Sequence, residues 1–244
     1  MIRLLSNKDE LLKLESILTG YLKLPFTEDT IPGSLMESVL ATVRNGRVLN
    51  TYDFIDVIKE SDKIGWQVKS TKHNTPVTWK RAKIANSSEL ISESFKSDEA
   101  LSILGNSIID FCNEHAKESI LHYNLDAIGY SRLIVNGNEI YYFERLLCTR
   151  ENPIIFNRED FVWKWSKPKE TKKKEQLPAL HGVNKNNNKK WFAWHGLGEN
   201  QLHFSGEKEW WPTDGSLLKF NFPSSKLNRD ELMNLLESLS SINK

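Results

Sequence analysis

Apolar residues recur at helical spacing in three separate parts of the chain. The first is residues 8–19, where leucine and isoleucine form one apolar face, and the second is the longer segment 99–123. Residues 228–238 repeat the pattern near the end of the sequence. We therefore predict an amphipathic helix in each of these segments.

A fourth helix is predicted by its end signals. Ser34 suits the N-cap, and Glu37 follows three residues later as a capping-box partner. The helix is expected to run to about Arg44 and to stop at Asn45-Gly46.

Two hairpins are predicted between these helices. Residues 47–58 are rich in β-branched and aromatic side chains and are followed by a polar turn and a second strand from Ile64. Residues 127–135 and 139–147 flank Asn136-Gly137, a pair typical of a type I′ turn. The order helix, two strands, helix, two strands predicts an α/β core with a mixed central sheet flanked by helices.

The pattern changes after residue 150. Short strands are expected at 161–166, 191–196, 200–204 and 216–222, and the polar segment 167–190 is expected to be a long loop. We therefore predict a catalytic core over residues 1–150 and a β-rich subdomain over residues 151–244 that packs on it.

Composition narrows the class of protein. The 244 residues are 39% hydrophobic and 27% charged, which is ordinary for a globular chain, and no apolar run is long enough for a membrane span. Cys112 and Cys148 form neither a CxxC pair nor a zinc-type spacing. With this cysteine usage the cytoplasm is the expected compartment, and without a long apolar run we expect no membrane partner. No P-loop and no GxSxG motif is present, so we expect no nucleotide cofactor and no nucleophile elbow.

The net charge of +1 conceals local basic clusters. Residues 67–84 contain no acid, and further basic clusters lie at 167–175 and 184–190. Such surfaces suit a phosphate backbone, and the Asn- and Lys-rich segment suits contacts with base edges. The side chains predicted to contact DNA are Lys72, His73, Lys80, Arg81, Lys83, Lys185, Asn187, Lys189 and Lys190, with phosphate contacts from the lysines near 172–174.

The register of the first hairpin decides which carboxylate lies near Lys69. A turn centred on Ser61 puts Asp53 opposite Lys69, on the same face as Gln67. A turn shifted by half a residue puts Asp56 opposite Gln67 instead. The sequence leaves both registers open, because a slip of one residue moves every side chain to the other face.

Carboxylate and amide oxygens are ligands that Mg²⁺ accepts, and a neighbouring lysine can orient a water or stabilise a phosphorane-like transition state. Together with the acid-free stretch, this group predicts metal-assisted phosphodiester hydrolysis, with Mn²⁺ as a substitute for Mg²⁺. The alternative interpretation makes Asp53 and Asp56 solvent-facing residues of an edge strand and Glu37 a simple capping residue.

Asp53, followed after thirteen residues by Gln67-Val68-Lys69, resembles the signature of the PD-(D/E)XK nuclease superfamily, which includes type II restriction endonucleases. The resemblance implies that Asp53 is the principal metal ligand and that Glu37 is a direct or water-mediated ligand. It also implies that Gln67 occupies the second acid position and that Lys69 is the catalytic lysine. Two departures are Tyr52 in place of proline and Gln67 in place of an acid, and Asp56 is the alternative ligand.

The function predicted from these residues is a Mg²⁺-dependent, sequence-specific endonuclease of double-stranded DNA. A homodimer is expected by analogy, because palindromic cutting needs two active sites. Two alternatives remain: a structure-specific or repair nuclease of the same fold, and a DNA-binding module in which Gln67 marks a lost ligand.

Overall fold

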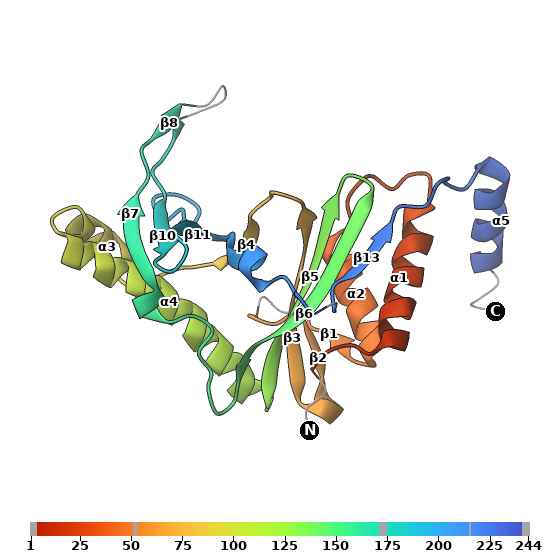
Figure 1. Cartoon of the computed structure of the whole chain (residues 1–244), viewed down its shortest axis with the longest axis horizontal. Coiled ribbons are helices and arrows are strands. Elements are labelled where there is room, and N and C mark those ends of the chain that lie inside the picture. The colour runs from red at the N-terminus through yellow and green to blue at the C-terminus, as the bar shows by residue number, and fades with distance from the viewer. Residues whose placement is uncertain (1–3, 51–52, 171–174, 215, 241–244) are drawn as a thin grey trace.

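The computed structural model describes residues 4–50, 53–170, 175–214 and 216–240, which form helices around two main sheets (Figure 1). The helices are α1 (Lys8–Leu22), α2 (Gly33–Arg44), α3 (Ser87–Ser94), α4 (Asp98–His122) and α5 (Arg229–Ser240), with short 3₁₀ helices η1 (Glu60–Asp62), η2 (Arg158–Asp160) and η3 (Gly206–Trp210). The three helices predicted from apolar spacing correspond to α1, α4 and α5, and the helix predicted from its end signals corresponds to α2. Helix α3 was not predicted.

The first sheet has the strand order β1–β2–β3–β5–β6–β13 and is mixed, because β3 and β5 are parallel while the other neighbours are antiparallel. Its strands are β1 (Arg47–Val48), β2 (Val57–Lys59), β3 (Ile64–Lys72), β5 (Ala127–Asn136), β6 (Glu139–Thr149) and β13 (Leu218–Asn221). This mixed sheet with its helices confirms the predicted α/β class.

The second sheet is antiparallel and has the order β4–β12–β11–β10–β7. Its strands are β4 (Val77–Arg81), β7 (Phe161–Trp165), β10 (Leu180–Asn184), β11 (Lys189–Trp194) and β12 (Gln201–Phe204); a separate pair, β8 (Lys169–Glu170) and β9 (Glu175–Gln176), projects from it (Figure 1). The prediction of one loop over 167–190 was therefore wrong. Strand β10 is largely buried and pairs with β7 on one side and β11 on the other, so its two sheet partners hold it in place.

Local signals placed the hairpins correctly but missed details of both. The expected strand over 47–58 is two short strands, β1 and β2, which pair with each other. In the second hairpin Asn136 pairs with Glu139, so the turn residues are Gly137 and Asn138. Only Gly137 has a positive φ, of 59°, which excludes the predicted type I′ turn, where both central residues need one.

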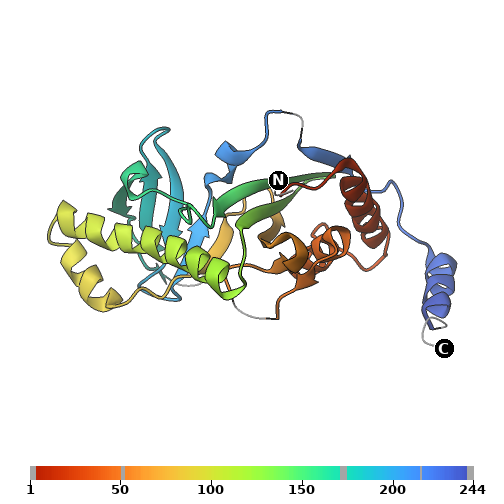
Figure 2. The ribbon, with the colours of Figure 1, turned by 90° about the horizontal axis from the view of Figure 1, so that it is seen from below.

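Two apolar cores lie on opposite faces of the first sheet. On one face, α1 and α2 cover Trp66, Val68 and Leu133. On the other face, the first sheet shares a core with α4 and the second sheet, and α4 extends beneath both sheets (Figure 2). Trp79 of β4 links the two sheets, since its ring lies 5.7 Å from that of Tyr130 in β5 and 4.9 Å from that of Phe204 in β12.

The strands of the two sheets are interleaved along the sequence. Strand β4 precedes residue 150 but belongs to the second sheet, and β13 follows residue 150 but pairs with β6 in the first sheet. The division into domains at residue 150 stays a prediction. Among the described residues, no helix combines the length and the apolar character needed to cross a membrane.

Candidate active site

Strand β2 starts at Val57, which pairs with Trp66, so the preceding residue Asp56 lies opposite Gln67. The second of the two registers is therefore the one adopted. The Asp56 carboxylate accepts a hydrogen bond from the backbone N–H of Val68, at 2.7 Å, through Oδ2. This bond fixes the carboxylate beside β3, and burial raises its pKa, although Lys69 and the Val68 N–H act in the opposite direction.

Glu37 reaches the same place from α2. It is half-buried, and its pKa is raised first by desolvation and then by the negative charge of Asp56, while Lys69 lowers it. The helix begins at Gly33 after an N-cap at Pro32, which makes no side-chain cap bond. The predicted capping box of Ser34 and Glu37 was therefore wrong.

Two lysines complete this group, which we call the edge cluster: Glu37, Asp56, Lys69 and Lys80. Lys69 is half-buried on β3, and Lys80 arrives from β4 in the other sheet. The pKa of Lys80 is lowered by burial, and Asp53 and Asp56 oppose that effect while Lys69 adds to it. Sequence reasoning assigned Lys80 to a general DNA surface. In the structure Lys80 lines a cavity with Asp53 and Glu118, and the charge of Asp56 also acts on it.

Gln67 belongs to β3 and is 1% exposed, and its side chain contacts β4. Its Nε2 donates a weak hydrogen bond of 3.4 Å to the backbone carbonyl of Trp79. Its Oε1 has no hydrogen-bond partner among the described residues. Because Gln67 lies opposite Asp56 in the strand register, the residue with this unpartnered oxygen is on the same face of the sheet as Asp56.

Asp53 lies near Lys80 rather than near Glu37. Its exposed carboxylate accepts a hydrogen bond from the hydroxyl of Tyr123. Tyr123 is the C-cap residue of α4. The two hydrogen-bonded residues line a cavity of about 230 Å³ together with Lys80 and Glu118. The charges that act on the pKa of Glu37 are those of Asp56 and Lys69, so Asp56 is the aspartate that the structure brings near Glu37.

The donor set fits a small hard cation. No group of three or more histidine, cysteine, aspartate or glutamate side chains in the described ranges is arranged to hold a metal ion. Mg²⁺ needs fewer protein ligands, since it commonly binds one or two carboxylates and keeps several waters. Glu37, Asp56 and the Oε1 of Gln67 satisfy that requirement.

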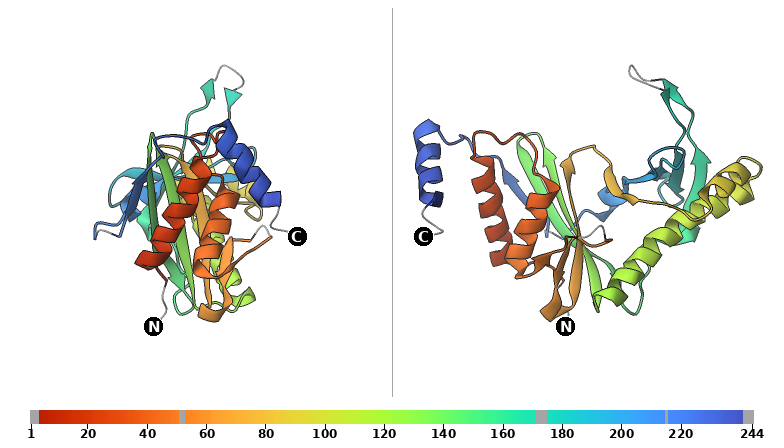
Figure 3. Two further views of the ribbon diagram at one scale, coloured as in Figure 1. Left: turned by 90° about the vertical axis from the view of Figure 1, so that its right-hand side faces the viewer. Right: turned by 180° about the vertical axis from the view of Figure 1, so that it is seen from behind.

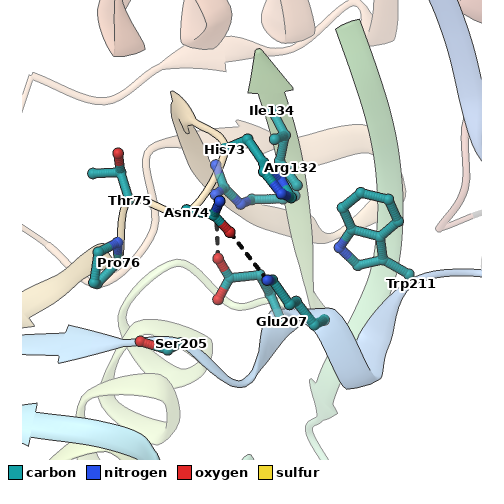
Figure 4. Close-up of a pocket in the computed structure, with 10 residues that line it drawn as sticks. His73, Asn74, Thr75, Pro76, Arg132, Ile134, Ser205, Glu207 and Trp211 are labelled. Atoms are coloured by element: carbon teal, nitrogen blue, oxygen red, sulfur yellow. Dashed lines mark hydrogen bonds and ion pairs between the residues drawn. The ribbon is translucent and has the colours of Figure 1, made fainter. Parts of the chain in front are cut away.

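The predicted DNA contacts near the β3–β4 turn have different surroundings. Lys72 forms an exposed ion pair of 2.8 Å with Asp29, and Arg81 and Lys83 are exposed. His73 lines a cavity beside Arg132 (Figure 4).

The predicted contacts at 185–190 surround the turn between β10 and β11. Lys185 is exposed, and Asn187 accepts a hydrogen bond from the N–H of Lys189. Lys189 also pairs with Glu209 at 2.6 Å, whereas Lys190 lines a cavity with three histidines. These residues do not join the edge cluster, and the lysines at 172–174 lie outside the described residues.

Sequence reasoning missed the connection between Lys69 and Lys80, although both lie in the acid-free stretch 67–84. The turn at 73–76 reverses the direction of the chain between β3, which carries Lys69, and β4, which carries Lys80. This turn was the sequence feature from which the connection could have been predicted. No family model, no curated protein and no solved structure matches this chain.

Proposed function

We propose that this chain is a metal-dependent, sequence-specific endonuclease of double-stranded DNA, with a core that resembles that of type II restriction endonucleases. The observation that supports this proposal is the edge cluster. Two carboxylates and two lysines converge from α2, β3, β4 and the residue before β2. This is a combination that metal-assisted phosphodiester hydrolysis uses.

Glu37, Asp56 and the Oε1 of Gln67 would hold Mg²⁺ or Mn²⁺. The cation would supply Lewis-acid polarisation of the scissile phosphate. Replacing the usual acid by Gln67 leaves two carboxylates, so a weaker affinity for the cation is expected in the absence of DNA. The phosphate of the substrate would then contribute the remaining negative charge.

Lys69 and Lys80 would act on the phosphate and on water. The positive charge of Lys69 acts on both carboxylates, because it lowers the pKa of Glu37 and the pKa of Asp56. Its ammonium group would orient the attacking water and stabilise the negative charge that develops on the phosphate. Lys80, desolvated beside Lys69, would neutralise a phosphate oxygen more strongly than an exposed lysine does.

Sequence recognition would come from groups outside the edge cluster. The turn at 185–188 and the exposed residues Arg81 and Lys83 offer amide and cationic side chains of the kind that contact base edges and phosphates. A homodimer with two active sites would suit cutting of both strands.

The test is incubation of the purified protein with supercoiled plasmid and Mg²⁺, followed by sequencing of the fragment ends. We expect discrete fragments and no cleavage in EDTA. Lys69→Ala and Asp56→Asn should each reduce the cleavage rate by about 10²-fold or more, since a positioned charge or acid–base group contributes roughly that much. Asp53→Asn should reduce it less than Asp56→Asn.

Asp62→Asn is the matched control, because this carboxylate lies on the same hairpin and pairs with Lys59 at 2.8 Å, away from the edge cluster. Full activity of Lys69→Ala with Asp56→Asn combined would overturn the proposal. A smear, or cutting only at junctions, would support a structure-specific nuclease instead. Tight DNA binding without Mg²⁺ or Mn²⁺ uptake would indicate an inactive binding module.

A further inference from the structure

A cavity of about 180 Å³ lies between the β3–β4 turn and η3, and it shares no lining residue with the edge cluster (Figure 4). The turn contributes His73 and Asn74, β5 contributes Arg132, and Glu207 and Trp211 come from η3 and the residue after it. Pockets for drug-sized ligands usually measure about 300–1,000 Å³, so this one suits a single small ring system.

Arg132 and Glu207 form a buried ion pair at one wall of this cavity. Their exposed fractions are 1% and 6%, and Nη2 of Arg132 lies 3.2 Å from Oε1 of Glu207. The guanidinium also donates to the carbonyl of Leu133 at 2.7 Å and to the hydroxyl of Thr71 at 2.8 Å. These bonds fix both charged groups in place.

Three polar atoms of the lining residues nevertheless have no hydrogen-bond partner among the described residues: Oε2 of Glu207, Nε of Arg132 and Nε1 of Trp211. Leaving a buried donor or acceptor unpaired is unfavourable, and more so when the group is charged. One acceptor and two donors therefore belong to side chains around one small cavity, beside the aromatic surface of Trp211.

Lys208 also lines the cavity. Its ammonium group donates a hydrogen bond to Oδ1 of Asn74 at 3.1 Å, and both residues are exposed. Because an exposed polar contact of this kind is weak, it would yield to an entering ligand.

We propose that this cavity binds a nucleobase. A base is planar, stacks on an aromatic ring, and presents an N–H next to a carbonyl oxygen or ring nitrogen along one edge. The N–H would donate to Oε2 of Glu207, and the adjacent acceptor would receive a hydrogen bond from Arg132 or Trp211. A phosphate fits less well, because the carboxylate of Glu207 would repel it.

This inference does not depend on the proposed nuclease activity, since binding is measured without cleavage. The probe is each of the four deoxyribonucleosides, added to full-length protein labelled with ¹⁵N. The eight tryptophans give separate indole N–H signals, and the Trp211 signal is identified by its loss in Trp211→Phe. We expect at least one nucleoside to shift that signal in a saturable way.

Glu207→Gln gives the second measurement. The amide oxygen would face Arg132, so an NH₂ group would replace the free acceptor and affinity should fall at least tenfold. Glu209→Gln is the matched control, because Glu209 is exposed on the same 3₁₀ helix, pairs with Lys189 and does not line the cavity. A tenfold loss in Glu207→Gln alone supports the assignment.

If no nucleoside shifts the Trp211 signal of the wild-type protein, the proposal is wrong, whether or not the variants fold. Undiminished binding by a folded Glu207→Gln would also overturn it, because the base would then lie elsewhere. A single-stranded oligonucleotide and its duplex, tested in the same way, show whether a base within a strand reaches the cavity.

Discussion

Glu37 and Asp56 place two partly buried carboxylates close enough for the charge of one to raise the pKa of the other. For both groups the largest cause of the raised pKa is desolvation, with Lys69 opposing it. A pKa raised by folding means that the ionised form is less favourable in the folded protein than in the unfolded chain. At neutral pH the ionised carboxylates of these two residues therefore reduce the stability of the folded protein.

Glu37→Gln should therefore stabilise the folded protein. Removing one charge should raise the melting temperature of the metal-free protein at pH 7.5 by roughly 1–2 °C, about the effect of 0.5 kcal/mol after solvent screening. The gain should shrink as the pH falls through the raised pKa of Glu37, because the wild-type carboxyl is then protonated. Added Mg²⁺ should stabilise the wild-type protein more than the variant.

The measurement is calorimetry at pH 7.5 and pH 4.5, with and without Mg²⁺. Glu15→Gln, on the partly exposed face of α1, is the control and should show neither trend. A lower melting temperature for Glu37→Gln at pH 7.5 would contradict this prediction. It would show that the attraction of Glu37 to Lys69 is stronger than the combined cost of burying its charge and of repulsion by Asp56.

At this scale the sequence could predict that an aspartate of the first hairpin lies near Gln67, but not which of the two aspartates it is. Asp53 and Asp56 have opposite parity along a strand, and one residue in the turn decides between them. Lys63 adopts a left-handed conformation with φ 51° after η1, and this four-residue connection sets the register. A lysine rarely adopts that conformation, so nothing in the local sequence indicated it.

Helix α4 contacts the second sheet at a position where no side chain fits. A Cβ atom added to Gly105 would lie 2.2 Å from the indole ring of Trp163 in β7. Glycine within a helix costs about 1 kcal/mol relative to alanine, so close approach of the ring is the physical reason for it.

Gly105→Ala should therefore destabilise the protein by about 1–3 kcal/mol despite the better helix former, because the clash exceeds the propensity gain. Gly20→Ala in α1 is the matched control: nothing lies within 4 Å of its added Cβ, and stability should rise by up to about 1 kcal/mol. Urea denaturation of both variants measures the difference. A stabilised Gly105→Ala would mean that Trp163 moves aside readily.

Elements with strong local patterns could be predicted, and elements defined by partners could not. The periodic spacing of apolar residues was sufficient to predict both α1 and α4 as helices. Strand β10 was not recognised, because its sequence LHGVN leads into a run of asparagines, and its pairing with β7 and β11 is what makes it a strand. The same applies to β4, which the sequence left unassigned.

Across the whole molecule, the two sheets share one core and exchange strands across residue 150. The core around Trp79 includes Tyr130 from the first sheet and Phe204 from the second, and the ring of Phe156 lies 5.4 Å from that of Trp79. Contacts between strands far apart in sequence decide this arrangement, so a boundary drawn from composition alone could not reveal it.

Residues 1–150 expressed alone should therefore fail to fold cooperatively. The fragment would lack β13, the partner of β6, and would expose Trp79 and the apolar side of α4 that the second sheet covers. The opposite truncation is the control: α5 has no buried residue and lies apart from both sheets (Figure 3), so residues 1–228 should keep the melting temperature within about 1 °C. Amide dispersion in ¹H–¹⁵N spectra separates the two outcomes. A well-dispersed spectrum from residues 1–150 would show that the first sheet is stable without the second, and that the shared core contributes less than its burial suggests.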